Sequence, residues 1–346
     1  MYPIIDGHND VLLRLWQKKT ENPAGDFLAG DGLGQMDLPR IRAGNMTGGF
    51  FAIFSPPVEH DDHDDDDLNP PYAGALSQKS AERAALGMLD FRDAILAQAG
   101  GSVLNCLTAA EMRAAMADGA LAMITHIEGA EAISPDLSNL QHYHDRGLRS
   151  LGPVWSRPNA FGVGVPFRFP SSPDVGAGLT KEGEALVREC NRLRIMVDCS
   201  HITERGFWDV ARVSTAPLVA THSNAHALSA SSRNLTDEQL RAIGQTGGMV
   251  GLNFANGFLR ADGLWASSVE PAVMLRHLDH MIRLAGEDCV GLGSDFDGAR
   301  IPGFIKDVSG LPRLVEAMDQ AGFGAEMIAK LTHQNWLRLL EKTWGM

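Results

Sequence analysis

The sequence predicts an α/β protein folded as a (β/α)₈ TIM barrel, and three observations lead to this prediction. Eight short apolar segments follow one another along the chain, and most are continuous runs, which are typical of buried parallel strands. Segments with helical periodicity lie between them. The 346 residues contain no Pro/Gly/Ser-rich linker, which favours a single domain over residues 1–346. A doubly wound sheet is the alternative, and it would need fewer strands or a second domain.

The predicted strands and helices alternate along the chain. The strand candidates are residues 3–6, 49–55, 121–127, 148–154, 194–199, 217–221, 248–253 and 289–293. The helix candidates are residues 77–99, 180–192, 203–213, 236–244, 269–284 and 311–320. Thr180, Thr203 and Thr236 mark helix starts, because acidic residues follow each of them in the first turn.

Two further segments lie outside this alternation. Residues 330–344 predict an amphipathic C-terminal helix that docks on the barrel. An acidic loop insertion is expected around residues 56–72, where His60 and His63 stand among six aspartates. We interpret this run, which includes residues 61–67, as a solvated surface loop, with a weak cation site as the alternative.

Charge and composition exclude several classes of protein. The 30 Lys and Arg residues against 43 Asp and Glu give a net charge of -13, which on average repels nucleic acid. The four cysteines form no CxxC pair, so a reducing compartment is the simple interpretation. We see no signal-peptide pattern at the N-terminus and no apolar run near the roughly 18–20 residues that cross a bilayer. We therefore expect a cytoplasmic protein with neither a nucleic-acid nor a membrane partner.

Residues of the types that bind metals follow several of the predicted strands. In a barrel, the carboxyl ends of the strands meet at one face, where catalytic groups lie. His8 and Asp10 follow the first strand and, two residues apart in an extended chain, point the same way. An imidazole and a carboxylate together suit a Zn²⁺-type ion. His201 and His222 follow two successive strands, so they would be neighbours that could bind a second ion.

Acidic residues complete this face. Glu128 ends the third strand, where its two oxygens could bridge two cations; a helix cap or a salt bridge is the alternative. Without metals, burial of so many charges would cost several kcal/mol per ion. Asp295 ends the last strand, where it could act as a general base and then as a general acid. We favour a structural role for Asp297, a supporting role for His126 and a surface position for His277.

Other catalytic motifs are missing from the sequence. His222 and His226 have the i, i+4 spacing of a helical zinc pair, but no glutamate stands between them as in HExxH. Walker A, GxGxxG and GxSxG patterns are also absent. The sequence therefore gives little support to a metalloprotease of the HExxH class, to nucleotide binding or to serine-hydrolase chemistry.

The motifs at these strand ends resemble those of the membrane dipeptidase (renal dipeptidase, peptidase M19) family, a member of the amidohydrolase superfamily. The matching motifs are GHND at 7–10, IEG at 127–129, SH at 200–201, HSN at 222–224, SRN at 232–234 and GSDFDG at 293–298. The resemblance implies an amidohydrolase-like barrel with its active site at the carboxyl ends of the strands. It also implies two Zn²⁺ ions per chain. His8 and Asp10 would bind one ion, His201 and His222 the other, and Glu128 and a hydroxide would bridge them.

The same resemblance implies a zinc-dependent dipeptidase that cleaves small dipeptides, with L-Xaa-D-Yaa as the expected type. The bridging hydroxide would attack the peptide bond, and Asp295 would handle its proton. Arg233 would bind the C-terminal carboxylate of the substrate, because a guanidinium can hold a carboxylate with two hydrogen bonds. The family often forms homodimers, so a homodimer is a further expectation.

The chain departs from the family pattern at one position. Family members often carry a substrate-contacting histidine in the loop after the fourth strand, and Trp155 stands at the matching place. Tryptophan offers one hydrogen-bond donor and an aromatic face, but it cannot change its protonation. We expect Trp155 to contact substrate, with Arg157 and His144 as candidates to compensate for the missing histidine.

Two alternative functions remain open. The first is another binuclear amidohydrolase that acts on a lactam, a cyclic amide or a related amide. Many members of that superfamily use a bridging lysine, and no lysine lies near the end of the third or fourth strand, which favours the dipeptidase. The second is a non-catalytic barrel, which would be expected to have lost a ligand or Asp295.

Overall fold

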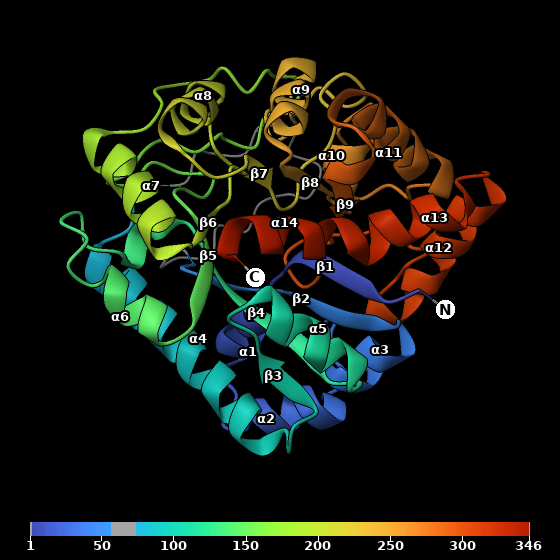
Figure 1. Ribbon diagram of the computed structural model, residues 1–346, viewed down its shortest axis with the longest axis horizontal. Coiled ribbons are helices and arrows are strands. Elements are labelled where there is room, and N and C mark those ends of the chain that lie inside the picture. The colour runs from blue at the N-terminus through green and yellow to red at the C-terminus, as the bar shows by residue number, and fades with distance from the viewer. Residues whose placement is uncertain (1, 57–73, 346) are drawn as a thin grey trace.

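The computed structural model describes residues 2–56 and 74–345, and it confirms the predicted barrel (Figure 1). One parallel sheet of nine described strands contains eight that follow one another in the order β6-β5-β4-β2-β1-β9-β8-β7. An isolated parallel bridge between Asp198 and Val219 joins the two ends of that order, β6 and β7, so the sheet is nearly closed. The doubly wound alternative is therefore wrong. Apart from Pro56, the acidic insertion expected around 56–72 lies outside the described residues.

The strands lie close to their predicted ranges. They are β1 (Ile4–Asn9), β2 (Met46–Phe54), β4 (Leu121–Glu128), β5 (Leu148–Gly152), β6 (Met196–Val197), β7 (Val219–Ala220), β8 (Met249–Leu252) and β9 (Val290–Leu292). The prediction missed β3 (Val103–Asn105), which pairs with the first residues of β4. This strand has three residues and its Leu104 is exposed, so it lacks the apolar run that identified the others.

Helices surround the strands (Figure 1). The predicted helices are present as α4 (Gln78–Gln98), α7 (Lys181–Leu193), α8 (Glu204–Val213), α9 (Asp237–Thr246), α11 (Pro271–Ala285) and α12 (Leu311–Gln320). The side chains of Thr180, Thr203 and Thr236 accept backbone hydrogen bonds at the starts of α7, α8 and α9, as N-caps do. The prediction missed α1 (Val11–Lys18), α2 (Pro23–Gly25), α3 (Leu38–Ala43), α5 (Ala109–Ala117), α6 (Leu140–Asp145), α10 (Asn256–Leu259) and α13 (Gly324–Ala329). Within the described ranges, the helices include none that is long and apolar enough to cross a membrane.

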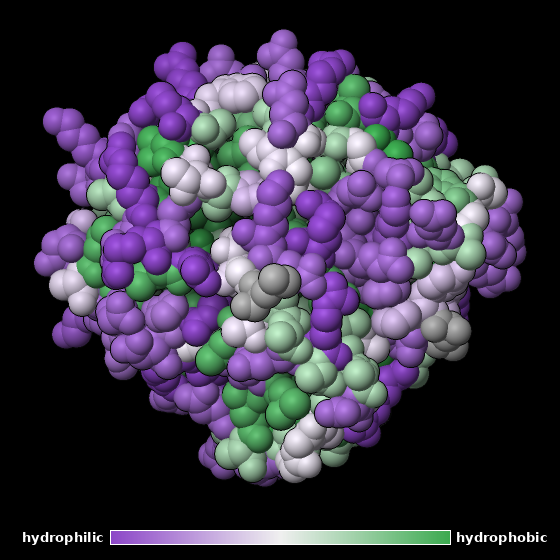
Figure 2. Space-filling model, in the orientation of Figure 1, coloured by the Kyte–Doolittle hydropathy of each residue, from purple (hydrophilic) through white to green (hydrophobic). Residues whose placement is uncertain are grey.

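The predicted C-terminal helix covers the end of the barrel where the strands begin. A π-helical turn over Lys330–Gln334 leads into α14 (Asn335–Trp344), which runs across the barrel (Figure 1). The Trp336 ring lies 5.0 Å from that of Phe50, and its indole donates to the carbonyl of Leu292. Gly7 and Gly291 make room for this indole, because a Cβ at either position would lie within 2.8 Å of it. The outward face over α14 is mostly hydrophilic (Figure 2).

The expectation that His277 lies on the surface is wrong. His277 is buried on the inner side of α11. Its Nδ1 accepts a hydrogen bond from the Ala225 backbone at 3.2 Å, so its Nε2 donates to the carbonyl of Leu259 at 3.0 Å. Burial lowers the pKa of His277 to about 4, and the ring is therefore neutral at physiological pH.

Candidate metal centre and active site

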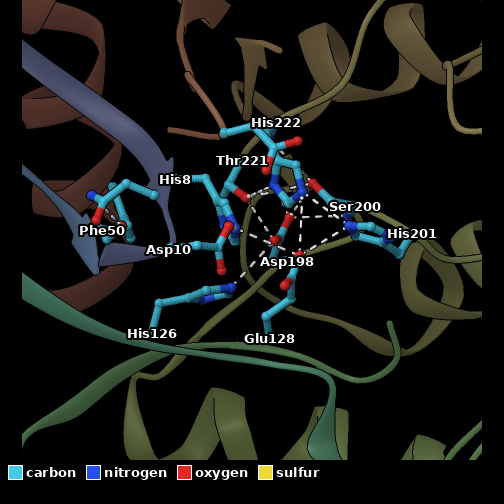
Figure 3. Close-up of polar contacts among 12 residues, drawn as sticks. His8, Asp10, Phe50, His126, Glu128, Asp198, Ser200, His201, Thr221 and His222 are labelled. Atoms are coloured by element: carbon cyan, nitrogen blue, oxygen red, sulfur yellow. Dashed lines mark hydrogen bonds and ion pairs between the residues drawn. The ribbon is translucent and has the colours of Figure 1, made fainter. Parts of the chain in front are cut away.

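The five candidate metal ligands converge at the carboxyl ends of four strands. His8 lies in β1 and Glu128 ends β4, whereas Asp10, His201 and His222 follow β1, β6 and β7. Figure 3 shows their imidazole and carboxylate groups turned toward one another. All five side chains are buried. The burial of five such groups at one place is typical of a metal centre, because isolated buried charges are costly.

The carboxylate of Glu128 is the centre of this cluster. Its Oε1 lies 2.9 Å from Nε2 of His201, 3.3 Å from Nε2 of His222 and 3.6 Å from Nε2 of His8. Nε2 of His8 is also 3.3 Å from Oδ2 of Asp10. The donor atoms form two overlapping groups, His8–Asp10–Glu128 and Glu128–His201–His222, each within 4.8 Å. Glu128 belongs to both groups, which is the position that a bridging ligand needs.

The hydrogen bonds behind His222 fix which ring nitrogen carries its proton. Thr221 Oγ1 donates to Oδ2 of Asp198 at 2.6 Å, so it accepts from Nδ1 of His222 at 2.9 Å. Nε2 of His222 then presents a lone pair, 3.0 Å from Nε2 of His201 and 3.3 Å from the Glu128 carboxylate. Atoms of this kind at these distances share either a proton or a metal cation. A hydroxyl that holds the far ring nitrogen is also typical of metal-binding histidines.

Several polar atoms of the first pair of ligands make no hydrogen bond within the described part of the chain. His8 Nδ1 and Nε2 and Asp10 Oδ1 are buried and make no hydrogen bond among the described residues. Burial alone would lower the pKa of His8, but the carboxylates of Glu128 and Asp10 raise it to about 10, so this position favours positive charge. Burial lowers the pKa of His201 and His222 well below the ordinary value, and neutral imidazole is the form that binds metal. The donor set therefore fits divalent ions of the Zn²⁺ type.

Asp295 follows β9 and lies beside the same donors. One of its carboxylate oxygens groups with ring nitrogens of His8 and His222, and its Oδ2 accepts a hydrogen bond from Nδ2 of Asn253 at 2.9 Å. Its φ of +63° lies in the left-handed region, which turns the chain sharply after the strand. Burial raises the pKa of Asp295, which makes proton uptake easier. Asp297 keeps the structural role predicted for it, because it accepts a hydrogen bond from Arg14 at 3.2 Å.

Arg233 is buried next to His222. Its guanidinium donates to the carbonyl of His222 at 3.0 Å and to the hydroxyl of Ser223 at 3.2 Å. Its Nε makes no hydrogen bond among the described residues. Burial lowers the pKa of Arg233 to about 10, so the group still carries its charge at neutral pH. A charged guanidinium with an unused N–H is suited to bind a carboxylate.

A cavity of about 120 Å³, which we call the mouth cavity, opens beside these groups. Trp155 lines it together with Asp10, Leu13, Phe54, Glu128, Phe167, His201, Phe258, Trp265, Asp295, Gly298 and Ala299. Trp155 is thus placed where it can meet a substrate. Arg157 is fully buried and paired with Glu131 at 2.6 Å, and His144 lies on α6 beside Asp145. Neither of them lines the cavity.

The structure adds residues to which the sequence analysis gave no role. Asp198 accepts hydrogen bonds from the backbone and hydroxyl groups of Ser200 and Thr221, and through Thr221 it supports His222. Ser156 Oγ lies 2.8 Å from Nδ1 of His201, and Asn253 orients Asp295. Nδ1 of His126 lies 2.8 Å from the Ser150 hydroxyl, and its ring lies 5.5 Å from that of His8, so its supporting role stays a prediction. The sequence signal for these residues was their place just after buried strands. The sequence does not show which polar residues at such places hydrogen-bond to the candidate ligands.

The nearly closed barrel and its buried nitrogen and oxygen donors define a (β/α)₈ barrel protein with a candidate metal centre. A family model described as membrane dipeptidase (peptidase family M19) matches residues 1–344. The chain belongs to the membrane dipeptidase family, peptidase family M19, and is a metallodipeptidase of that family.

Solved structures agree with this assignment. A metallopeptidase of family M19 called dipeptidase AC is 52% identical, with a TM-score of 0.95 over 100% of this chain and 99% of the other. A metallopeptidase from Rhodobacter sphaeroides, solved with a phosphinate mimic of the dipeptide L-Ala-D-Ala, is also 52% identical, with a TM-score of 0.96 over 99% of both chains. An amidohydrolase from Pseudomonas aeruginosa is 20% identical, with a TM-score of 0.77 over 100% of this chain and 97% of that chain, and shares the fold.

Proposed function

We propose that this enzyme hydrolyses small dipeptides of the L-Xaa-D-Yaa type at the donor cluster. The observation that carries the proposal is the buried guanidinium of Arg233, which adjoins His222 and has an N–H group without a partner among the described residues. A dipeptide carries its C-terminal carboxylate one residue beyond the bond to be cut, so a fixed cation next to the reactive centre selects that length. The ligand of the Rhodobacter sphaeroides relative, a mimic of L-Ala-D-Ala, supports the stereochemistry.

The donor cluster fits two zinc ions. His8 and Asp10 would hold one, His201 and His222 would hold the other, and Glu128 would be shared between them. Bound there, zinc would supply a Lewis acid for the peptide carbonyl and lower the pKa of a water to near neutrality.

Side chains of the protein bind the substrate, transfer the proton and position the proton acceptor. Arg233 binds the substrate carboxylate and places the peptide bond over the cluster. Asp295 accepts a proton from the water as its oxygen bonds to the carbonyl carbon. When the C–N bond breaks, Asp295 passes that proton to the leaving nitrogen and returns to its ionised form. Asn253 holds the carboxylate of Asp295 in place through its 2.9 Å hydrogen bond.

Hydrolysis of a dipeptide library by the zinc-loaded protein tests this proposal. The library pairs L residues at the first position with L or D residues at the second, and tripeptides and dipeptide amides serve as controls. We expect cleavage of L-D dipeptides, with both controls inert because they cannot place a carboxylate at Arg233. If fully metallated protein cleaves no dipeptide, the proposed substrate class is wrong, and lactams and cyclic amides become the next substrates to assay.

A further inference from the structure

The mouth cavity has an unusually aromatic lining for a site that surrounds charged ligands. Five of its residues, Phe54, Trp155, Phe167, Phe258 and Trp265, form what we call the aromatic wall. The cavity volume of about 120 Å³ is well below the roughly 300–1,000 Å³ of ordinary small-molecule pockets. The same cavity reaches Glu128, His201 and Asp295, so a substrate must pass the wall to react.

The rings of the aromatic wall form a continuous chain of contacts. Phe54 lies 5.0 Å from Trp155, Trp155 lies 5.4 Å from Phe167, and Phe167 lies 5.8 Å from Phe258, measured between ring centroids. Phe258 and Trp265 follow at 4.8 Å. Tilted and edge-to-face pairs at these distances are favourable packing arrangements. The wall is therefore one packed layer of rings.

Packing behind the Trp155 end holds that end of the wall in position. The guanidinium of Arg157 lies 5.1 Å from the ring centroids of both Phe54 and Trp155. Glu131 fixes this guanidinium through a buried ion pair of 2.6 Å. A cation held against two ring faces stabilises their positions. Movement of Trp155 would therefore lose a contact with a buried, ion-paired guanidinium.

The Trp265 end is held by backbone contacts. The side chain of Asn256 donates to the carbonyls of Trp265 at 3.2 Å and Ser267 at 3.0 Å. Gly257 lets the indole pack directly on α10, because a Cβ at that position would lie 2.5 Å from the Trp265 ring. Both ends of the wall are thus supported, and a larger substrate would not displace them cheaply.

The two ends of the wall face different ends of a dipeptide. This step rests on the proposed function, in which Arg233 binds the substrate carboxylate. The Arg233 guanidinium lies 5.4 Å from the ring of Phe258, which packs on Trp265. The C-terminal residue of the substrate therefore lies at the Phe258 end. Trp155 is separated from Phe258 by the ring of Phe167 and lies 5.7 Å from the ring of His201, so we place the N-terminal residue of the substrate there.

We infer that the aromatic wall restricts this enzyme to dipeptides with small side chains at both positions. Trp155 limits the size of the N-terminal residue, and Trp265 limits the size of the C-terminal residue. Tryptophan at position 155 thus acts as a size limit where the family resemblance led us to expect a histidine.

A crossed substrate and mutant experiment tests this inference. The substrates are L-Ala-D-Ala, L-Phe-D-Ala and L-Ala-D-Phe, and kcat/KM is measured for each with zinc-loaded enzyme. The wild type should prefer L-Ala-D-Ala over either bulky dipeptide by at least about tenfold, as size exclusion by a pocket commonly gives. Trp155→Ala should reduce the discrimination against L-Phe-D-Ala by about tenfold and leave that against L-Ala-D-Phe unchanged. Trp265→Ala should do the reverse.

Three controls separate size exclusion from general damage. Trp155→Phe keeps a bulky ring and should keep most of the discrimination, whereas Trp208→Ala removes an exposed tryptophan on α8 and should change none of the three values. Metal content and Tm should match the wild type in the variants assayed. Equal wild-type kcat/KM for all three dipeptides would overturn this inference but not the proposed function. The same holds if one variant accepts both bulky dipeptides. Failure to cleave any of them would overturn the proposed function as well.

Discussion

The two sides of the barrel are built differently. On one side, β1, β2 and β4 have 6, 9 and 8 residues, and β2 and β4 pair in unbroken register over seven positions. On the other side, β6, β7, β8 and β9 have only 2, 2, 4 and 3 residues. We call these the long-strand half and the short-strand half. The site draws on both, because His8 and Glu128 come from the first, and His201, His222 and Asp295 from the second.

Buried polar side chains replace the missing backbone pairs in the short-strand half. Asp198 Oδ1 accepts from the backbone of Thr221 at 2.8 Å. Asn224 and Asn253 exchange two hydrogen bonds, each between the side chain of Asn224 and the backbone of Asn253, at 2.9 and 3.0 Å. Because the ladders end early, the chain is free to turn, and His201 and Asp295 have φ values of +65° and +63°. Regular strands thus hold one set of ligands, and polar side-chain networks hold the other.

The largest effect is expected at Asp295, where a substitution should lower turnover without changing metal binding. Asp295→Asn should lower kcat by roughly 10²–10⁴-fold, because an amide cannot carry the proton of the reaction. Metal content should stay at the wild-type level, since the five candidate ligands are untouched. Asp297→Asn is the matched control, because Asp297 pairs with Arg14, and it should keep most of the turnover. Steady-state kinetics with metal analysis measures both, and wild-type turnover in Asp295→Asn would remove this residue from the mechanism.

The next effect tests whether side-chain networks really support the short-strand half. Asp198→Ala removes the shared acceptor of four buried donors of Ser200 and Thr221, so we expect a loss of about 3–5 kcal/mol in the free energy of unfolding. Asp37→Ala removes the N-cap of α3 and an ion pair with the partly exposed Arg40, and should cost only about 1–2 kcal/mol. Denaturant unfolding compares the two variants. Equal losses would show that Asp198 has no special part in holding the strands.

The sequence predicted well the long-strand half and the convergence of the five candidate ligands, because both depend on local patterns. Apolar runs identified each barrel strand, and polar residues just after them identified the cluster. The start of α1 was hidden, because its N-cap Asp10 makes no capping hydrogen bond and turns its carboxylate into the cluster. The buried place of His277 was equally hidden, since its partners Ala225 and Leu259 come from distant segments. Tertiary contacts of this kind leave no periodic signal.

A smaller effect is expected at Gly298, where the two halves meet. A Cβ at this position would lie 2.2 Å from Oδ2 of Asp10 and 2.6 Å from Oδ1 of Asp295. Gly298→Ala should therefore push both carboxylates aside and weaken zinc binding by about 10–100-fold. Gly303→Ala is the control, because a Cβ there meets nothing within 4 Å. Competition with a zinc chelator measures both variants, and equal affinities would show that the loop can shift at little cost.

The smallest effect is expected at Asn253, which connects the polar side chains of the short-strand half to the carboxylate of Asp295. Asn253→Ala removes two hydrogen bonds of the side chain. Nδ2 of Asn253 donates one to Asp295 at 2.9 Å, and its Oδ1 accepts the other from the Ala255 backbone at 2.6 Å. We expect kcat to fall by about tenfold with KM and metal content unchanged, because the proton acceptor is misplaced while the substrate contacts stay. Asn253→Asp keeps the size but sets a second carboxylate against Asp295, so it should be at least as harmful. A rise in KM with constant kcat would instead assign Asn253 to substrate binding. Unchanged kinetics in both variants would mean that the turn at Asp295 positions its carboxylate without help from the network.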